Sequence, residues 1–164
     1  MKKITFILLA LIAGTAFGQD ASATATVNAH IVEVITIQEG TDLNFGNIVA
    51  STGGAVRVNT EGTRTFSNPD MKVANTGTVS AASFEVTAAE FFSYSISIPS
   101  IVLNGPETST MDVSFTSEID GNTDGIAEGT GAPQTLNVGG LLTVASGQVS
   151  GDYTGEVTVT VAYE

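Results

Sequence analysis

The residues best suited to chemistry lie in one acidic loop, DGNTDGIAE at positions 120–128. Its Asp-x-Asn-x-Asp-Gly opening matches the start of a calcium-binding loop. Carboxylate and amide oxygens at alternate positions are ligands that Ca²⁺ prefers. The sequence therefore makes calcium a candidate cofactor, held by Asp120, Asn122, Asp124 and Glu128.

The same loop also has a purely structural interpretation. The twelfth position of a helix-flanked calcium loop is a bidentate Glu, but here it is Gly131, and no helical pattern flanks the loop. Asp, Asn and Gly are in addition the residues that form tight turns between strands. A calcium site and a polar hairpin tip both stay open, and nothing in the sequence requires a cofactor.

The chain has few residues of the types that usually act in catalysis. The sequence has no Cys, so neither a thiol nucleophile nor a Cys-ligated zinc site is possible. The single His, His30, lies on the polar face of a strand pattern, and no Gly-x-Ser-x-Gly motif occurs. Paired carboxylates remain conceivable, but no pair stands out among the acidic residues. We therefore expect a protein that is not an enzyme.

The first eighteen residues have the features of a secretory signal peptide. Lys2 and Lys3 precede an apolar run over 4–13, and Ala16-Phe17-Gly18 is a small-residue cleavage signal. The apolar run is too short for a membrane span, so we expect none after cleavage. We predict export, with transit through the periplasm to the cell surface or the medium.

The remaining residues are strongly acidic. Residues 19–164 hold three basic and 17 acidic side chains, a net charge of −14. A surface of this sign repels nucleic acid and anionic lipid, and we exclude both as partners.

The elements that must position these residues are β-strands. Short alternating segments rich in Val, Thr and Ser are separated by Gly, Asn, Asp and Pro, and no helical spacing persists. This spacing predicts an all-β, two-sheet sandwich in one domain, with a barrel as the alternative. The predicted strands cover 23–38, 43–49, 54–60, 63–66, 80–88, 92–98, 101–104, 111–118, 133–138, 140–146 and 153–163, and Gly139-Gly140 is predicted as a turn.

The N-terminal strand pattern has two interpretations. Small apolar residues alternate with polar ones up to Ile31, after which adjacent apolar residues break the alternation. The segment is either the first strand of its own sandwich or, over 19–32, an extension that adds to a sheet edge of another subunit. The sandwich domain would then cover 33–164. The donor side chains of such an extension would be Ala23, Ala25, Val27, Ala29 and Ile31.

Six internal blocks and the closing strand together resemble the exported bacterial family catalogued as domain of unknown function 4402. The blocks are LNFGNI (43–48), TGG followed by VRV (52–58), ASFEVT (82–87), YSISIP (94–99), MDVSF (111–115) and LNVGGLLTV (136–144). That family is similar to pilin-like subunits of chaperone–usher systems, including the spore-coat-U type. The resemblance implies an immunoglobulin-like, pilin-like sandwich without enzymatic activity. This chain differs from many such pilins because it has no cysteine and therefore no disulfide.

The resemblance implies a function in assembly. Partners would be other copies of the chain or related subunits, a periplasmic chaperone and an outer-membrane usher. The acceptor edge would involve the closing strand and its apolar face, Val157, Val159, Val161 and Tyr163. We therefore expect an exported structural subunit of a filament or coat that acts in adhesion. The alternative is a monomeric secreted or cell-surface module that binds a glycan or protein through its loops and is stabilised by calcium.

Overall fold

The computed structural model describes residues 20–50 and 52–164. The chain divides into two compact units, Met1–Ile31 and Val32–Glu164. The predicted signal peptide, residues 1–18, lies outside the described residues. Within the described part of the chain, no helix is both long enough and apolar enough to cross a membrane.

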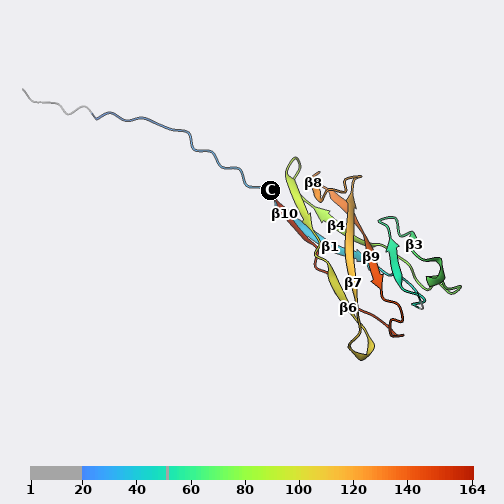
Figure 1. The fold of residues 1–164 in the computed structure, drawn as a ribbon. Helices are drawn as coiled ribbons and strands as arrows, with labels where there is room; N and C mark the ends of the chain where they lie inside the picture. The colour runs from blue at the N-terminus through green and yellow to red at the C-terminus, as the bar shows by residue number, and fades with distance from the viewer. Residues whose placement is uncertain (1–19, 51) are drawn as a thin grey trace, which may run out of the picture. The chain divides into compact units, whose positions relative to one another are not determined.

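The second unit is all-β, apart from two single-turn 3₁₀ helices, and its strands form two antiparallel sheets (Figure 1). The larger sheet has the order β1-β4-β9-β2-β3, with β7 along the opposite edge of β9 and β6 beyond β7; the smaller has the order β10-β5-β8. The strands are β1 (Thr36–Thr41), β2 (Gly54–Val58), β3 (Arg64–Phe66), β4 (Ala82–Thr87), β5 (Ser93–Ser97), β6 (Ile101–Asn104), β7 (Thr110–Ile119), β8 (Ile126–Glu128), β9 (Pro133–Val144) and β10 (Thr160–Tyr163); the 3₁₀ helices are Pro69–Met71 and Pro106–Thr108.

The longest strand, β9, corrects one prediction. It pairs with β4 over its first half and with β2 over its second, and it passes straight through the predicted turn at Gly139-Gly140. A Cβ at Gly140 would lie 2.8 Å from Leu43 Cδ2, and one at Gly139 would lie 2.5 Å from the Val58 carbonyl oxygen. These glycines therefore allow close approach within the sheet and do not form a turn.

The core confirms a two-sheet sandwich. One cluster joins residues of the larger sheet (Val86, Ile119 and Leu136) to Tyr94 and Ala127 of the smaller sheet. A second cluster lies on the larger sheet and is covered by loops and by the short helix that ends at Met71; its buried members are Val56, Met71, Val113, Leu142 and Val144. Because the first cluster includes both sheets, its burial holds them face to face.

Several predicted boundaries differ from the structure. The segment 43–49 forms only the isolated bridge between Asn44 and Ser80, and the rest of it is loop. The short strand β8 follows the acidic turn and was not predicted. Alternation of only three residues is too weak a signal to separate a strand from a loop. The strands predicted at 54–60, 63–66, 80–88, 92–98, 101–104 and 111–118 are confirmed to within two residues at each end.

Candidate functional site

The closing segment of the chain crosses from one sheet to the other. Thr154 exchanges two backbone hydrogen bonds with Asn104, at 2.8 and 3.0 Å, beside the larger sheet. Six residues later the chain enters β10, which pairs with β5 in the smaller sheet. Of the strand predicted over 153–163, only the last four residues form a regular strand. The segment that runs beside it also crosses between the sheets, because β5 belongs to the smaller sheet and β6 to the larger.

The predicted alternation of the closing segment is present in the structure. Val157, Val159, Val161 and Tyr163 are half-buried, and the residues between them are exposed. Val159, Val161 and Tyr163 pack against the core cluster shared by the two sheets. None of the four is fully buried, so this apolar face retains surface that a further strand could cover.

Within the described part of the chain, β10 pairs with a strand along one edge only. Its partner there is β5. Tyr163 fixes the end of this edge, since its hydroxyl accepts a hydrogen bond from the Ala89 N–H at 2.7 Å and donates one to the Glu33 carbonyl at 3.0 Å. Its ring packs edge-on against Phe92, with centroids 5.9 Å apart. The strand end is therefore rigidly held, although its outer edge is open.

The predicted donor residues lie on an exposed segment. Residues 20–31 form no strand or helix, and all are exposed, including Val27 at 91% and Ile31 at 92%. The strand predicted over 23–38 is corrected in its bounds: β1 covers Thr36–Thr41 and pairs with β4. The residues that do pack on the core from this end of the chain are Ile35 and Ile37.

The acidic loop connects β7 of the larger sheet to β8 of the smaller sheet, so it is a turn between the sheets and not the tip of a hairpin. Asp124 Oδ1 accepts a hydrogen bond from the Ile126 N–H at 3.1 Å, which is an Asx turn leading into β8. Asp120 has a φ of 48°, and its Oδ2 accepts a 2.6 Å hydrogen bond from Gln134 Nε2. Across the described residues, no three His, Cys, Asp or Glu side chains gather as metal ligands would. The carboxylates of Asp120 and Asp124 therefore each accept a hydrogen bond from the protein, and they form no such group with Glu128.

A buried polar chain connects this loop to the core. The Tyr94 hydroxyl donates to Gln134 Oε1 at 3.2 Å, and Gln134 Nε2 also donates to the Glu128 carbonyl at 3.1 Å. Tyr94 is fully buried and Gln134 is 6% exposed. Burial, and then the charge of Asp120, raises the pKa of Tyr94 to about 12. No buried side-chain nitrogen or oxygen among the described residues is left without a hydrogen bond.

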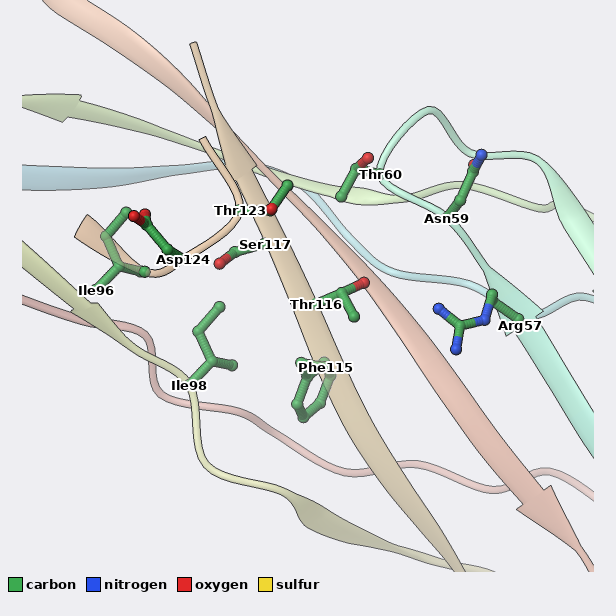
Figure 2. A pocket seen from close by; sticks show the side chains of 11 residues that line it. Arg57, Asn59, Thr60, Ile96, Ile98, Phe115, Thr116, Ser117, Thr123 and Asp124 are labelled. Carbon is green, nitrogen blue, oxygen red and sulfur yellow. The ribbon is translucent and has the colours of Figure 1, made fainter. Parts of the chain in front are cut away.

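A pocket that the sequence did not predict lies where β5 and β7 diverge (Figure 2). Its volume is about 590 Å³, and its lining mixes apolar side chains with hydroxyl, amide and charged groups; in Figure 2, Asp124 lies beside Ile96, and Arg57 and Asn59 lie on the opposite side of the view. The lining residues are Arg57, Asn59, Thr60, Ile96, Ile98, Phe115, Thr116, Ser117, Thr123, Asp124 and Gly125. They come from four separate parts of the chain, so no motif in the sequence could have identified the pocket.

Comparison with known proteins identifies the domain. The model of the family described as domain of unknown function (DUF4402) matches residues 35–163. No curated protein matches the chain. The match begins one residue before β1 and ends with the last residue of β10, so it covers every strand of the two sheets. The chain therefore belongs to the DUF4402 family.

Proposed function

We propose that this protein is an exported structural subunit of a surface filament or coat, which assembles non-covalently by β-strand addition and acts in adhesion. Its sandwich is then of the immunoglobulin-like, pilin-like kind. One observation carries the proposal: β10, which carries half-buried apolar side chains, pairs on one edge only within the described residues, and the chain supplies a strand-patterned segment, residues 20–31, that is itself assigned to no strand. The segment could supply the strand that the edge of β10 is missing, and that edge could supply the partner that the segment needs.

Strand addition would satisfy both features at once. Backbone N–H and C=O groups of residues 20–31 from one copy would extend the sheet at β10 of another copy. Val27 and Ile31 are the two large apolar anchors, since the other donor side chains are alanines that bury little area. Before assembly, an open edge of this kind promotes aggregation, which favours a periplasmic chaperone that lends a strand and an outer-membrane usher that exchanges it.

The test is electrophoresis of the surface-shed protein, unheated beside boiled. We expect a ladder that collapses to one band on boiling, because a chain without cysteine cannot form disulfide-linked polymers. Deletion of residues 20–31 should abolish the ladder. Val27→Asp with Ile31→Asp should do the same, because both side chains would enter an apolar groove.

The matched control places charges in the opposite phase of the same segment. Thr24→Asp with Thr26→Asp adds the same two charges to the polar face, which would stay in solvent after strand addition. This variant should keep the ladder. A single monomer band in all lanes of the wild-type protein would contradict the proposal.

A second candidate function is a binding module, and the pocket between β5 and β7 favours it. Such a module needs no second copy, so it would run as a monomer and keep its ligand after deletion of residues 20–31. The same gel therefore separates the two candidates.

A further inference from the structure

Two of the few basic residues of this acidic protein line one small pocket. Residues 19–164 hold three basic side chains, and two of them, Arg64 and Lys72, line a pocket of about 320 Å³. The other described residues that line it are uncharged: Gly62, Phe66, Val73, Thr76 and Val79. The lining is therefore positive, although the net charge of residues 19–164 is −14.

The guanidinium of Arg64, on β3, is held in one orientation. Its Nη1 donates hydrogen bonds to the carbonyl oxygens of Phe45 and, at 3.0 Å, Asn47. Its central carbon lies 4.8 Å from the centroid of the Phe66 ring. Gly46 leaves room for this arrangement, because a Cβ there would lie 2.8 Å from Nη1. Since the side chain is already fixed, it loses little conformational entropy when a ligand binds.

The opposite edge of the same guanidinium is available to a ligand. All the hydrogen bonds that the described residues accept from Arg64 come from Nη1. No buried side-chain nitrogen in the described part of the chain lacks a hydrogen bond, so the unbonded Nε and Nη2 atoms reach solvent. Nε–H and one Nη2–H are parallel donors along one edge of the plane, and a carboxylate accepts such a pair with both of its oxygens.

We propose that this pocket binds a sugar acid, a single sugar ring that carries a carboxylate. The carboxylate accepts two hydrogen bonds from the Nε–Nη2 edge of Arg64, and Lys72 adds a second positive charge. Val73 and Val79 are half-buried and offer apolar surface to the C–H groups of the ring. Thr76 supplies a hydroxyl group that can pair with those of the sugar.

Charge and size favour this ligand over other anions. The long-range field of so acidic a chain repels a doubly charged phosphate about twice as strongly as a singly charged carboxylate. The two donors on the free edge of Arg64 lie in one plane, as the two oxygens of a carboxylate do. A volume of about 320 Å³ is at the lower end of ligand pockets, which suits one ring and its substituents better than an extended chain.

The test is isothermal titration calorimetry of the purified protein with two matched sugars. Methyl glucuronide and methyl glucoside differ only in a carboxylate that replaces a hydroxymethyl group. We expect the glucuronide to bind roughly tenfold more tightly, because hydrogen bonds to a charged acceptor are gained. Equal binding of the two sugars, or binding of neither, would overturn the proposal. If acetyl-Ala-Glu-Ala-amide binds as tightly as the glucuronide, the carboxylate is recognised without its sugar, and the assignment to a sugar acid is wrong.

Two variants that each remove one positive charge form a matched pair. Lys72 and Arg57 are both exposed, but only Lys72 lines this pocket. Lys72→Ala should weaken glucuronide binding roughly threefold, and Arg57→Ala should leave it unchanged. Equal weakening in both variants would show that only net charge matters, and the site would be rejected.

A third variant tests the planar edge itself. Arg64→Lys keeps the charge but loses the pair of parallel donors, so it should abolish the preference for glucuronide over glucoside. An unchanged preference would contradict the assigned role of the guanidinium. If this variant does not fold, the comparison of Lys72→Ala with Arg57→Ala still decides.

The titration and the electrophoresis test of strand addition have separate outcomes, because residues of one copy line the whole pocket. A monomer that binds the glucuronide would support the sugar site and contradict the filament. A ladder whose subunits bind no glucuronide would support the filament and overturn the sugar site.

Discussion

At the scale of single residues, Arg64 stabilises the loop over 43–49, although its charge alone would suggest only a solvent-exposed side chain. Its Nη1 donates hydrogen bonds to the carbonyl oxygens of Phe45 and Asn47, and its guanidinium lies 4.8 Å from the centroid of the Phe66 ring. Burial lowers the pKa of Arg64. One side chain thus fixes the loop that was predicted as a strand over 43–49, and it replaces the backbone pairing that a strand would have made.

The first prediction compares the two arginines of one strand pair. Arg64→Ala should lower the free energy of unfolding by about 2 kcal/mol, because two hydrogen bonds from a charged donor to the carbonyls of Phe45 and Asn47 are lost. Arg57→Ala, on the exposed face of β2, should change it by less than about 0.5 kcal/mol. Urea unfolding followed by far-UV circular dichroism measures both changes, since the chain has no tryptophan to report by fluorescence. Equal losses in the two variants would argue against a structural role specific to Arg64.

The second prediction concerns the buried Tyr94. An unfolded tyrosine has a pKa of about 10, and in the folded protein the pKa of Tyr94 is raised to about 12. Above pH 10 the unfolded chain releases this proton and the folded chain keeps it, so the unfolded state gains relative stability. Stability should therefore be complete below pH 10 and fall as the pH rises toward 12.

Tyr94→Phe supplies the control for that pH dependence. It loses the hydrogen bond to Gln134, so its stability at neutral pH should fall by about 1 kcal/mol. Its decline between pH 10 and 12 should be shallower than that of the wild type. Parallel curves for the two proteins would show that Tyr94 is not the titrating group.

At the scale of elements, the sequence predicts the strands better than their partners. Alternation locates β2 to β7 within two residues, because each buries one face. It fails at Gly139-Gly140, where the missing side chains let β2 and the loop residues Leu43 and Phe45 approach β9 closely. It also fails before Thr36, where residues 20–31 have the pattern of a strand but are not assigned to one. A pattern reports which faces could be buried, and only tertiary contacts decide whether they are.

The candidate sites also differ in how far a sequence pattern alone could predict them. The acceptor face, Val157 to Tyr163, could be predicted because it is continuous in sequence and alternates. The pocket could not, because Arg57, Ile98 and Phe115 converge only after β5 and β6 divide between two sheets. The acidic loop was ambiguous because turn formers and calcium ligands are the same residue types. Its hydrogen bonds to Gln134 and Ile126 favour the turn.

At the scale of the whole molecule, charge opposes assembly. With a net charge of −14 over residues 19–164, two copies repel each other before any strand can be exchanged. Salt screens this repulsion, with a Debye length of about 8 Å at physiological ionic strength. Strand addition, by contrast, depends on backbone hydrogen bonds and apolar contacts that salt does not weaken. The rate of polymerisation should therefore rise with NaCl concentration, as followed by light scattering.

The same experiment separates screening from calcium binding. Screening depends on ionic strength, so CaCl₂ and NaCl matched for ionic strength should accelerate assembly to a similar extent. A bound ion would instead act at low concentration and raise the melting temperature, an effect that EDTA would reverse. Asp120→Ala with Asp124→Ala would remove it. We expect the matched salts to behave alike and EDTA to leave the melting temperature unchanged, because both carboxylates already accept hydrogen bonds, Asp124 from the Ile126 N–H and Asp120 from the Gln134 side chain. A calcium effect that is far stronger than that of NaCl and is lost in the double variant would restore the metal site and make the acidic loop a regulator of assembly.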